Sequence, residues 1–149
     1  MVFGSDSTLT GNWNIWHHLR FARSLRLVED SELFGMITSL PAKLWNLNSG
    51  ELKSGKDADI IAVKKKTGTP TWDDIFKINP EEILLIIIKG KIRMFDKALH
   101  DQITGLPLHL PQFSRLSLKG SIKFVEGDLH ALITNIKSYN PQVQFPVEA

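Results

Sequence analysis

Apolar residues recur at helical spacing over the first third of this chain. They predict an amphipathic helix from Ile15 to about Val28, with Asn12 or Asn14 as its N-cap. A second apolar stripe runs over residues 33–47, where Pro41 interrupts it. Because proline fits the start of a helix, the stripe predicts two short helices, with Pro41 at the first position of the second.

Two hairpins are predicted in the second half of the chain. Residues 83–88 are apolar without alternation, as expected of a strand covered on both faces. Lys89-Gly90 separates them from residues 91–95 and predicts a tight turn, since glycine supplies the positive φ that a two-residue turn needs. The same pattern predicts a second hairpin over residues 113–125, across Lys119-Gly120.

The C-terminal residues predict a mixed tail. Residues 98–111 contain two prolines and Gly105, so irregular structure is expected there. Asp128 can cap a last helix, whose apolar residues between 129 and 139 form one stripe. No internal repeat and no low-complexity segment is apparent.

The central stretch from Ser49 to Val63 contains two turn signals, Ser49-Gly50 and Ser54-Gly55. A short run of alternating polarity lies between these signals, and residues rich in β-branched side chains follow the second. The pattern predicts two strands hinged by glycine. Taken alone, this stretch is scaffold and carries no chemistry.

Composition narrows the class of protein. With 42% hydrophobic and 23% charged residues, the 149 residues suffice for about one ordinary core. Lys and Arg number 18 against 16 acidic residues, and a net charge of +2 is too small to indicate nucleic acid or a membrane surface as a partner. The basic run Lys64-Lys65-Lys66 is interpreted as a solvated loop.

Cysteine is absent, which excludes disulfides, thiolate metal sites and a cysteine nucleophile. The longest apolar run, residues 83–88, is too short to span a membrane, and the N-terminus lacks the pattern of a signal peptide. A cytoplasmic location is therefore expected.

The order of the motifs along the chain is more specific than any one of them. A short strand ends in Gly4-Ser5-Asp6-Ser7, an amphipathic helix follows, and Pro41-Ala42 opens a further helix. Next comes the pattern Gly50-x-Leu52-x-x-Gly55-Lys56-x-Ala58-Asp59-Ile60-Ile61, and finally the apolar strand that runs into Lys89-Gly90-Lys91. Over roughly residues 2–95 this order resembles the C-terminal part of the metal-dependent amidohydrolase superfamily. It is most similar to the branch that includes cytosine deaminase, the triazine hydrolases and imidazolonepropionase.

The resemblance implies an α+β fragment of a larger fold, a (β/α)8 barrel with a small composite β-sandwich. Residues 1–48 would be the C-terminal end of the barrel, with its last strand and the helices after it. Residues 49–97 would be C-terminal strands of the β-sandwich, and residues 98–149 would be an irregular linker, a hairpin and a C-terminal helix.

The implied activity is hydrolysis of non-peptide carbon–nitrogen bonds in a small-molecule substrate, such as deamination or cyclic amide hydrolysis. In the family, the aspartate at the position of Asp6 binds a catalytic divalent metal and takes a proton from the metal-bound water. A carboxylate suits zinc, iron or manganese, and the metal lowers the pKa of the water toward neutrality. Asp6 is thus the implied metal ligand and the implied catalytic residue.

Two departures from the family pattern limit this expectation. Leu40 stands where the family usually has an asparagine before Pro-Ala, and leucine cannot cap a helix. The family's His-x-His, its lysine or fourth-strand ligand and its further histidines have no counterparts in the chain, and one carboxylate cannot replace them. We therefore expect a fragment that is inactive alone and binds no metal alone. Its uncovered surfaces, Val2-Phe3 and an apolar helix face, predict a self-associated or domain-swapped oligomer.

Other polar residues are interpreted as structural. His17 and His18 are adjacent on a helix, point about 100° apart and so cannot chelate one ion together. Asp57 and Asp59 precede a strand and are interpreted as turn residues.

Trp13, Trp16 and Trp45 fit packing better than ligand stacking. His100, His109 and His130 are interpreted as surface or satisfied polar residues. Two rival functions remain open. One is a non-catalytic β-sandwich interaction module derived from an amidohydrolase, and the other is a complete small enzyme that uses Asp6 with His17 or His18.

Overall fold

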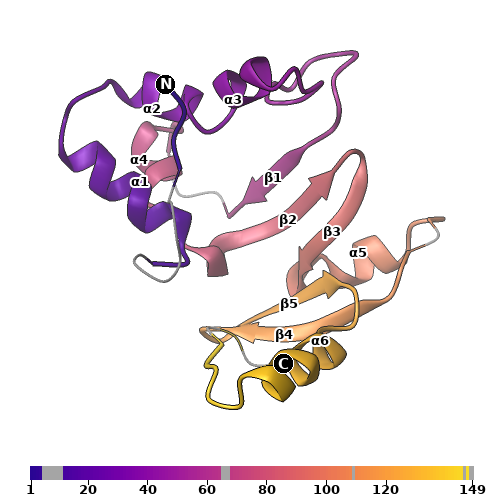
Figure 1. Ribbon diagram of the computed structural model, residues 1–149. Helices are drawn as coiled ribbons and strands as arrows, with labels where there is room; N and C mark the ends of the chain where they lie inside the picture. Colours follow the sequence, from indigo (N-terminus) through magenta and orange to yellow (C-terminus); the bar gives the residue numbers. More distant parts are fainter. Residues whose placement is uncertain (5–11, 65–67, 109, 146, 148–149) are drawn as a thin grey trace. The chain divides into compact units, whose positions relative to one another are not determined.

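The structure is a computed structural model that describes residues 1–4, 12–64, 68–108, 110–145 and 147. It divides into two compact units (Figure 1). The helical unit comprises Met1–Asp59 and Lys65–Pro80, and the sheet unit comprises Ile60–Lys64 and Glu81–Ala149. The division implied by the resemblance, into residues 1–48, 49–97 and 98–149, stays a prediction.

The helical unit is built around one small apolar core. Leu19, Leu33, Met36 and Phe76 are buried there and are contributed by different parts of the unit. Its four helices are α1 (Ile15–Ser24), α2 (Asp30–Gly35), α3 (Ser39–Leu44) and α4 (Trp72–Phe76). The predicted cap of α1 is confirmed, because Asn14 Oδ1 accepts a hydrogen bond of 3.0 Å from the Trp16 N–H.

Two helix boundaries differ from the prediction. α1 ends at Ser24 instead of near Val28, because the chain turns into the left-handed region at Arg26, with φ +52°. α3 begins at Ser39, so Pro41 is its third residue and not its first. The first four N–H groups of a helix have no intrahelical acceptor, which makes proline acceptable at this position too.

The glycine-rich stretch contains one strand and not the predicted two. Only β1 (Ile60–Val63) is extended and paired, whereas residues 50–59 form bends, one turn at Ser54-Gly55 and irregular backbone. Gly50 and Gly55 have φ of +83° and +85°, and the Asp57 N–H donates to the Asn48 carbonyl at 2.7 Å. The chain is thus folded back on itself, and its backbone groups bond locally instead of along a neighbouring strand.

Gly50 also lies in close contact with α3. A Cβ atom at Gly50 would lie 2.7 Å from both the Ala42 Cβ and the Thr38 carbonyl oxygen. This contact is closer than a side chain permits, so residue 50 must be glycine for its space as well as for its φ.

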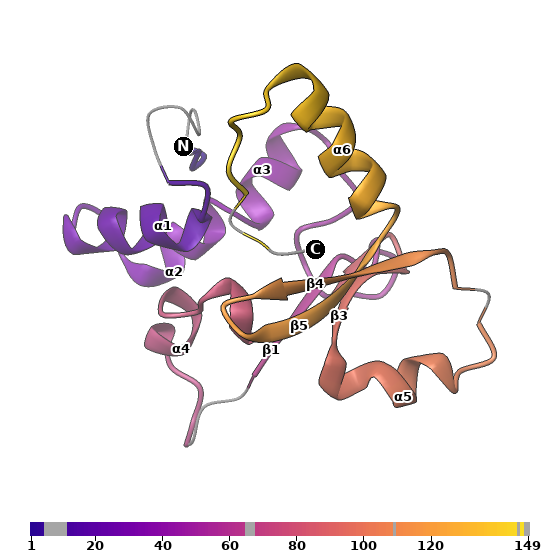
Figure 2. The same ribbon diagram turned by 90° about the horizontal axis from the view of Figure 1, so that it is seen from below.

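The described residues of the sheet unit form one antiparallel five-stranded sheet with the order β1-β2-β3-β5-β4 (Figure 1; Figure 2 gives the view from below). β2 (Ile83–Ile88) and β3 (Lys91–Asp96) form the first predicted hairpin, and β4 (Phe113–Leu118) and β5 (Ser121–Glu126) form the second. β2 is less covered than predicted, since Ile83 is buried but Ile88 is 45% exposed. The assignment of these strands to a β-sandwich, and of the helices to a barrel, stays a prediction.

Both hairpin turns are confirmed. Lys89 and Gly90 have φ of 49° and 74°, and Lys119 and Gly120 have φ of 48° and 81°. Two successive positive φ values define the type I′ turn, whose twist matches that of the strands it joins.

The segment between the hairpins is more regular than predicted. A 3-10 turn, η2 (Lys97–Leu99), leads into α5 (His100–Thr104), whose Ile103 is buried. Asp96 starts this turn, since its Oδ1 accepts from the Ala98 N–H at 2.8 Å. A further 3-10 turn, η1 (Pro80–Glu82), precedes β2. The last helix, α6 (Leu129–Tyr139), has the predicted cap, because Asp128 Oδ1 accepts from the Ala131 N–H at 2.9 Å.

Candidate active-site segment

The candidate ligand Asp6 lies outside the described residues, as do Ser5, Ser7 and His109. The structure does describe the residues that flank Asp6 on both sides. On the N-terminal side, the Phe3 N–H donates to the Met36 carbonyl at 3.2 Å, and the Phe3 side chain packs against the core of the helical unit. This flank is therefore attached to the end of α2.

The C-terminal flank is held by the first turns of α1. Asn12 Oδ1 accepts from the Asn14 N–H at 2.8 Å, and His18 Nε2 lies 2.6 Å from the Asn12 carbonyl oxygen. Because a carbonyl oxygen only accepts, Nε2 must carry the hydrogen in this contact. His18 therefore anchors the chain just after the candidate segment.

The role of His18 differs from those considered from the sequence. A helical side chain leans toward the N-terminus of its helix, so a polar residue one turn into α1 can reach the chain before it. That lean, together with two polar residues at positions 12 and 14, is the sequence signal that could have identified the anchor. His17 is exposed.

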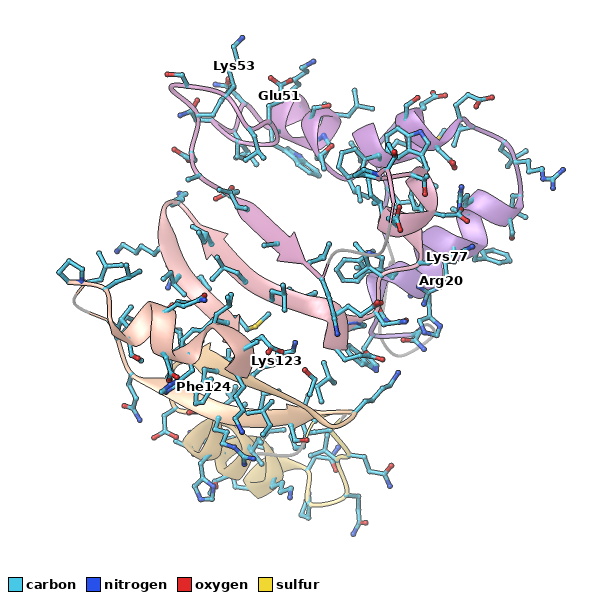
Figure 3. All side chains as sticks on the ribbon, turned by 180° about the vertical axis from the view of Figure 1, so that it is seen from behind. Arg20, Glu51, Lys53, Lys77, Lys123 and Phe124 are labelled. Atoms are coloured by element: carbon cyan, nitrogen blue, oxygen red, sulfur yellow. The ribbon has the colours of Figure 1, made fainter. Side chains whose placement is uncertain are left out.

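Arg20, in α1, makes hydrogen bonds to the C-terminal end of α4. Its Nη1 donates to the carbonyls of Phe76 and Ile78, at 3.3 and 3.1 Å. Phe76 is the last residue of α4 and Ile78 lies two residues beyond it, so both carbonyls are at the C-terminal end of the helix, where backbone oxygens lack intrahelical partners and carry partial negative charge. Figure 3 labels Arg20 and, nearby on α4's C-terminal side, Lys77.

Arg23 joins three parts of the helical unit. Its Nε and Nη2 donate to the two carboxylate oxygens of Asp30, at 2.7 and 2.6 Å, and its Nη1 donates to Asp73 at 2.6 Å. Lys77 also donates to Asp73, at 2.6 Å. The sequence pattern did not reveal this network, because Asp30 and Asp73 are 7 and 50 residues from Arg23.

These contacts change the ionisation of the network. Hydrogen bonds to Asp30 and then Asp73 raise the pKa of Arg23 above its usual range. Hydrogen bonds from Lys77 and then Arg23 lower the pKa of Asp73 to about 2. The ionised form of Asp73 is therefore favoured in the folded chain.

Acid should weaken the helical unit through Asp73. A carboxylate whose pKa is lower in the folded state stabilises the fold above its unfolded pKa of about 3.9. That stabilisation is lost as the pH falls toward the folded value of about 2. Urea unfolding followed by tryptophan fluorescence should show a lower midpoint at about pH 2 than at about pH 5. All four tryptophans lie in this unit, at 13, 16, 45 and 72.

Asp73→Asn is the matched control for this pH effect. The variant keeps the size of the side chain and removes its titration. Its stability should therefore fall less between the two pH values than that of the unchanged chain. Equal losses in the two proteins would contradict the role of Asp73.

The remaining candidates form no metal site among the residues that the structure describes. No group of three or more His, Asp or Glu there could hold a metal ion. Asp57 Oδ1 lies 3.4 Å from Asn48 Nδ2, and the Asp57 carbonyl accepts from the Asp59 N–H, as expected of turn residues. His100 contacts Asp101 at 2.9 Å, and its ring lies 5.0 Å from that of Phe124.

The sheet unit contains a buried ion pair that the sequence pattern did not reveal. Lys123, in β5, is 2% exposed, and its Nζ donates to the carbonyls of Glu81 and Ile83 and to Asp96 Oδ2, at 2.8, 2.6 and 2.6 Å. Burial alone would raise the pKa of Asp96, but hydrogen bonds from Lys123, Ala98 and Ser121 together hold it below its usual value. The alternation of β5 places Lys123 on the same face as Ser121 and Val125, a mixed polar and apolar set that gives no clear signal of burial.

The fold is an α+β arrangement of small helices and one antiparallel sheet, and none of the described helices has the length and apolarity needed to cross a membrane. The family model described as the amidohydrolase family matches residues 1–93. The chain therefore belongs to the amidohydrolase family, which makes it a member of a hydrolase superfamily. Comparisons with curated proteins and with solved structures give no match.

Proposed function

We propose that the chain is the C-terminal part of a metal-dependent hydrolase that cleaves non-peptide carbon–nitrogen bonds in a small molecule. The proposed reaction is deamination or cyclic amide hydrolysis, in the branch that includes cytosine deaminase, the triazine hydrolases and imidazolonepropionase. The supporting observation is the family match over residues 1–93, which includes Gly4-Ser5-Asp6-Ser7, Pro41-Ala42 and the stretch from Gly50.

The described residues do not by themselves fit a divalent metal, since they include no cluster of ligating side chains. Asp6 is the one ligand that we propose for zinc, iron or manganese, and such metals take three or more protein ligands at a catalytic site. The other ligands are thus proposed to come from polypeptide outside residues 1–149. No catalytic step through the metal is derived from this chain.

The proposal predicts that the 149-residue chain, supplied with zinc, iron or manganese, releases no ammonia from amino-substituted heterocycles and opens no cyclic amides. A polypeptide whose coding sequence extends upstream into a His-x-His strand should have the activity. In that polypeptide, Asp6→Asn should lower kcat/KM by about 10² to 10⁴-fold, because a proton acceptor contributes that much. The measurement is ammonia release or ring opening.

The unfolding midpoint of the Asp6→Asn polypeptide should stay unchanged, which separates chemistry from folding. Two results would contradict the proposal. One is an initiation codon at Met1 with no coding sequence upstream. The other is activity of the 149-residue chain itself that Asp6→Ala abolishes, which would favour the complete small enzyme.

Exposed apolar side chains favour the alternative, a non-catalytic interaction module. Leu44, Trp45 and Leu52 are 66%, 60% and 78% exposed in and after α3. Leu44 and Trp45 are adjacent in the chain, and an exposed apolar patch is typical of a contact with a partner. We propose that self-association uses the exposed residues Leu44 and Trp45. Val2 and Phe3 are half-buried and therefore offer less apolar surface to a partner. Leu44→Asp should then lower the sedimentation coefficient if a dimer forms there.

A further inference from the structure

The turn and second strand of the first hairpin and the turn and second strand of the second hairpin follow one pattern, displaced by 30 residues. The repeat is too short to stand out along the chain, but the strand pairing aligns it. Each copy has a Lys-Gly type I′ turn and one residue that differs between the copies, Lys91 or Ser121; an isoleucine, a basic residue, two apolar residues and an acidic residue follow. The aligned residues are Lys89, Gly90, Ile92, Arg93, Met94, Phe95 and Asp96 in the first copy, and Lys119, Gly120, Ile122, Lys123, Phe124, Val125 and Glu126 in the second.

The pairing of β3 with β5 has the symmetry of this repeat. Met94 pairs with Val125, and Phe95 pairs with Phe124. The counterpart of Met94 is Phe124, and the counterpart of Val125 is Phe95. Replacing both residues by their counterparts therefore converts the Met94–Val125 pair into the Phe95–Phe124 pair. β3 and β5 are therefore related by a local two-fold axis, and each strand presents to the other nearly the same edge.

The charges follow the same symmetry. Lys123 pairs with Asp96 at 2.6 Å, and Arg93 pairs with Glu126. These two ion pairs are counterparts, because Arg93 corresponds to Lys123 and Asp96 corresponds to Glu126. A basic residue and an acidic residue on each strand thus fix the register of the other strand at both ends of the contact.

An interface with two-fold symmetry is the kind that joins two copies in a homodimer, because each partner uses the same surface. Here both halves lie in one chain, and residues 97–112 connect them. Once η2 and α5 unwind, this connection can reach roughly 50 Å, at about 3.3 Å per residue. The connection contains α5, in which Ile103 is the one buried residue, so few buried contacts oppose its rearrangement. The connection is therefore long enough for the second hairpin to pair with another copy.

We propose that two copies of this chain exchange their second hairpins, residues 113–126, so that β5 of each copy pairs with β3 of the other. The partner is a second copy because its β5 carries the charges and apolar residues that β3 already accepts. Pairing within one chain competes with this exchange at an effective concentration of about 1 mM for a flexible connection. The exchanged dimer therefore forms when the chain refolds at high protein concentration.

A charge-reversal pair tests the exchange with the full chain. Arg93→Glu places two acidic residues together at the Arg93–Glu126 contact, and Glu126→Arg places two basic residues there. When the two variants exchange hairpins with each other, each residue at position 93 meets a residue of opposite charge at position 126 of the other copy. Both contacts are then complementary again. Equal amounts unfolded in urea and refolded together should give a one-to-one heterodimer by native mass spectrometry. Each variant refolded alone should give less dimer than the mixture.

Two further samples complete the test. The unchanged chain should contain a larger dimer fraction after refolding at about 1 mM than at about 10 µM, by sedimentation. A chain with Arg93→Glu and Glu126→Arg together restores the contact internally, so it should behave as the unchanged chain does. A charge-reversed double variant that dimerises no more than the unchanged chain supports the proposal, and one that dimerises as strongly as the mixture overturns it.

A matched control uses an ion pair away from the hairpins. Lys43 and Glu51 lie 3.9 Å apart and are exposed, in the helical unit. Refolding Lys43→Glu together with Glu51→Lys should give no heterodimer above the level of the unchanged chain. Either of two results would overturn the proposal: a hairpin mixture that remains monomeric, or a dimer that Leu44→Asp abolishes and the hairpin charges leave unaffected. The second result would instead place the contact on α3.

Discussion

Replacing Lys123 by methionine should destabilise the sheet unit by about 3–5 kcal/mol, the cost of removing one partner from a buried ion pair. Nζ of Lys123 makes three hydrogen bonds, to two carbonyls and to Asp96. Methionine fills similar space but leaves a half-buried carboxylate without its counterion and two carbonyls without a donor. Hydrogen exchange of the β3 and β5 amides should report the loss, because these strands contain the contact.

Lys119→Met is the control for this substitution. Lys119 lies at the turn of the same hairpin and is 3.7 Å from Glu81, but its side chain is 63% exposed. An exposed pair contributes about 0–1 kcal/mol, so this variant should exchange almost as slowly as the unchanged chain. If both variants lose the same protection, the burial of Lys123 has no special importance.

Replacing Gly50 by alanine should destabilise the helical unit by about 2–5 kcal/mol. The backbone conformation, with φ +83°, costs about 1–2 kcal/mol for a residue with a Cβ. Overpacking against Ala42 and the Thr38 carbonyl, each 2.7 Å from the new Cβ, adds about 1–3 kcal/mol. Urea unfolding followed by tryptophan fluorescence measures the change, since Trp45 lies at the end of α3.

Gly55→Ala separates the two causes. Gly55 has nearly the same φ, +85°, but nothing lies within 4 Å of a Cβ built on it. This variant should show the backbone cost alone, so it should be more stable than Gly50→Ala by the overpacking cost. Equal losses would mean that the contact with α3 relaxes without cost.

The elements that the sequence predicted correctly are those that local chemistry determines. Asn14 and Asp128 cap helices through bonds to residues two or three positions away. The Lys89-Gly90 and Lys119-Gly120 turns need only two successive positive φ values. Such features require no knowledge of what lies elsewhere in the fold.

The errors arose where distant residues decide. Residues 51–53 have the alternation of a strand, but they pair with no neighbouring strand. α5 forms inside a segment with two prolines because Asp96 starts a turn before it and Ile103 is buried. Lys123 was not identified because its partners, Glu81 and Ile83, precede it by about forty residues.

The candidate site also combines residues found from the sequence with contacts found only in the structure. Asp6 was identified by resemblance, and the family match includes it, but its role as metal ligand stays a prediction. The contacts that hold the flanking residues Phe3 and Asn12 were found only in the structure. The Met36 carbonyl after α2 binds Phe3, and the His18 imidazole in α1 binds Asn12.

The anchoring of these flanks affects how inactive mutants should be interpreted. In a selection for lost activity in a larger enzyme of this kind, substitutions at His18 should be recovered beside those at Asp6. The Asn12 carbonyl would lose its donor, so the chain at Asn12 would lose its attachment to α1. Second substitutions that restore the attachment of Asn12 to α1 should restore activity to the His18 mutants but not to the Asp6 mutants.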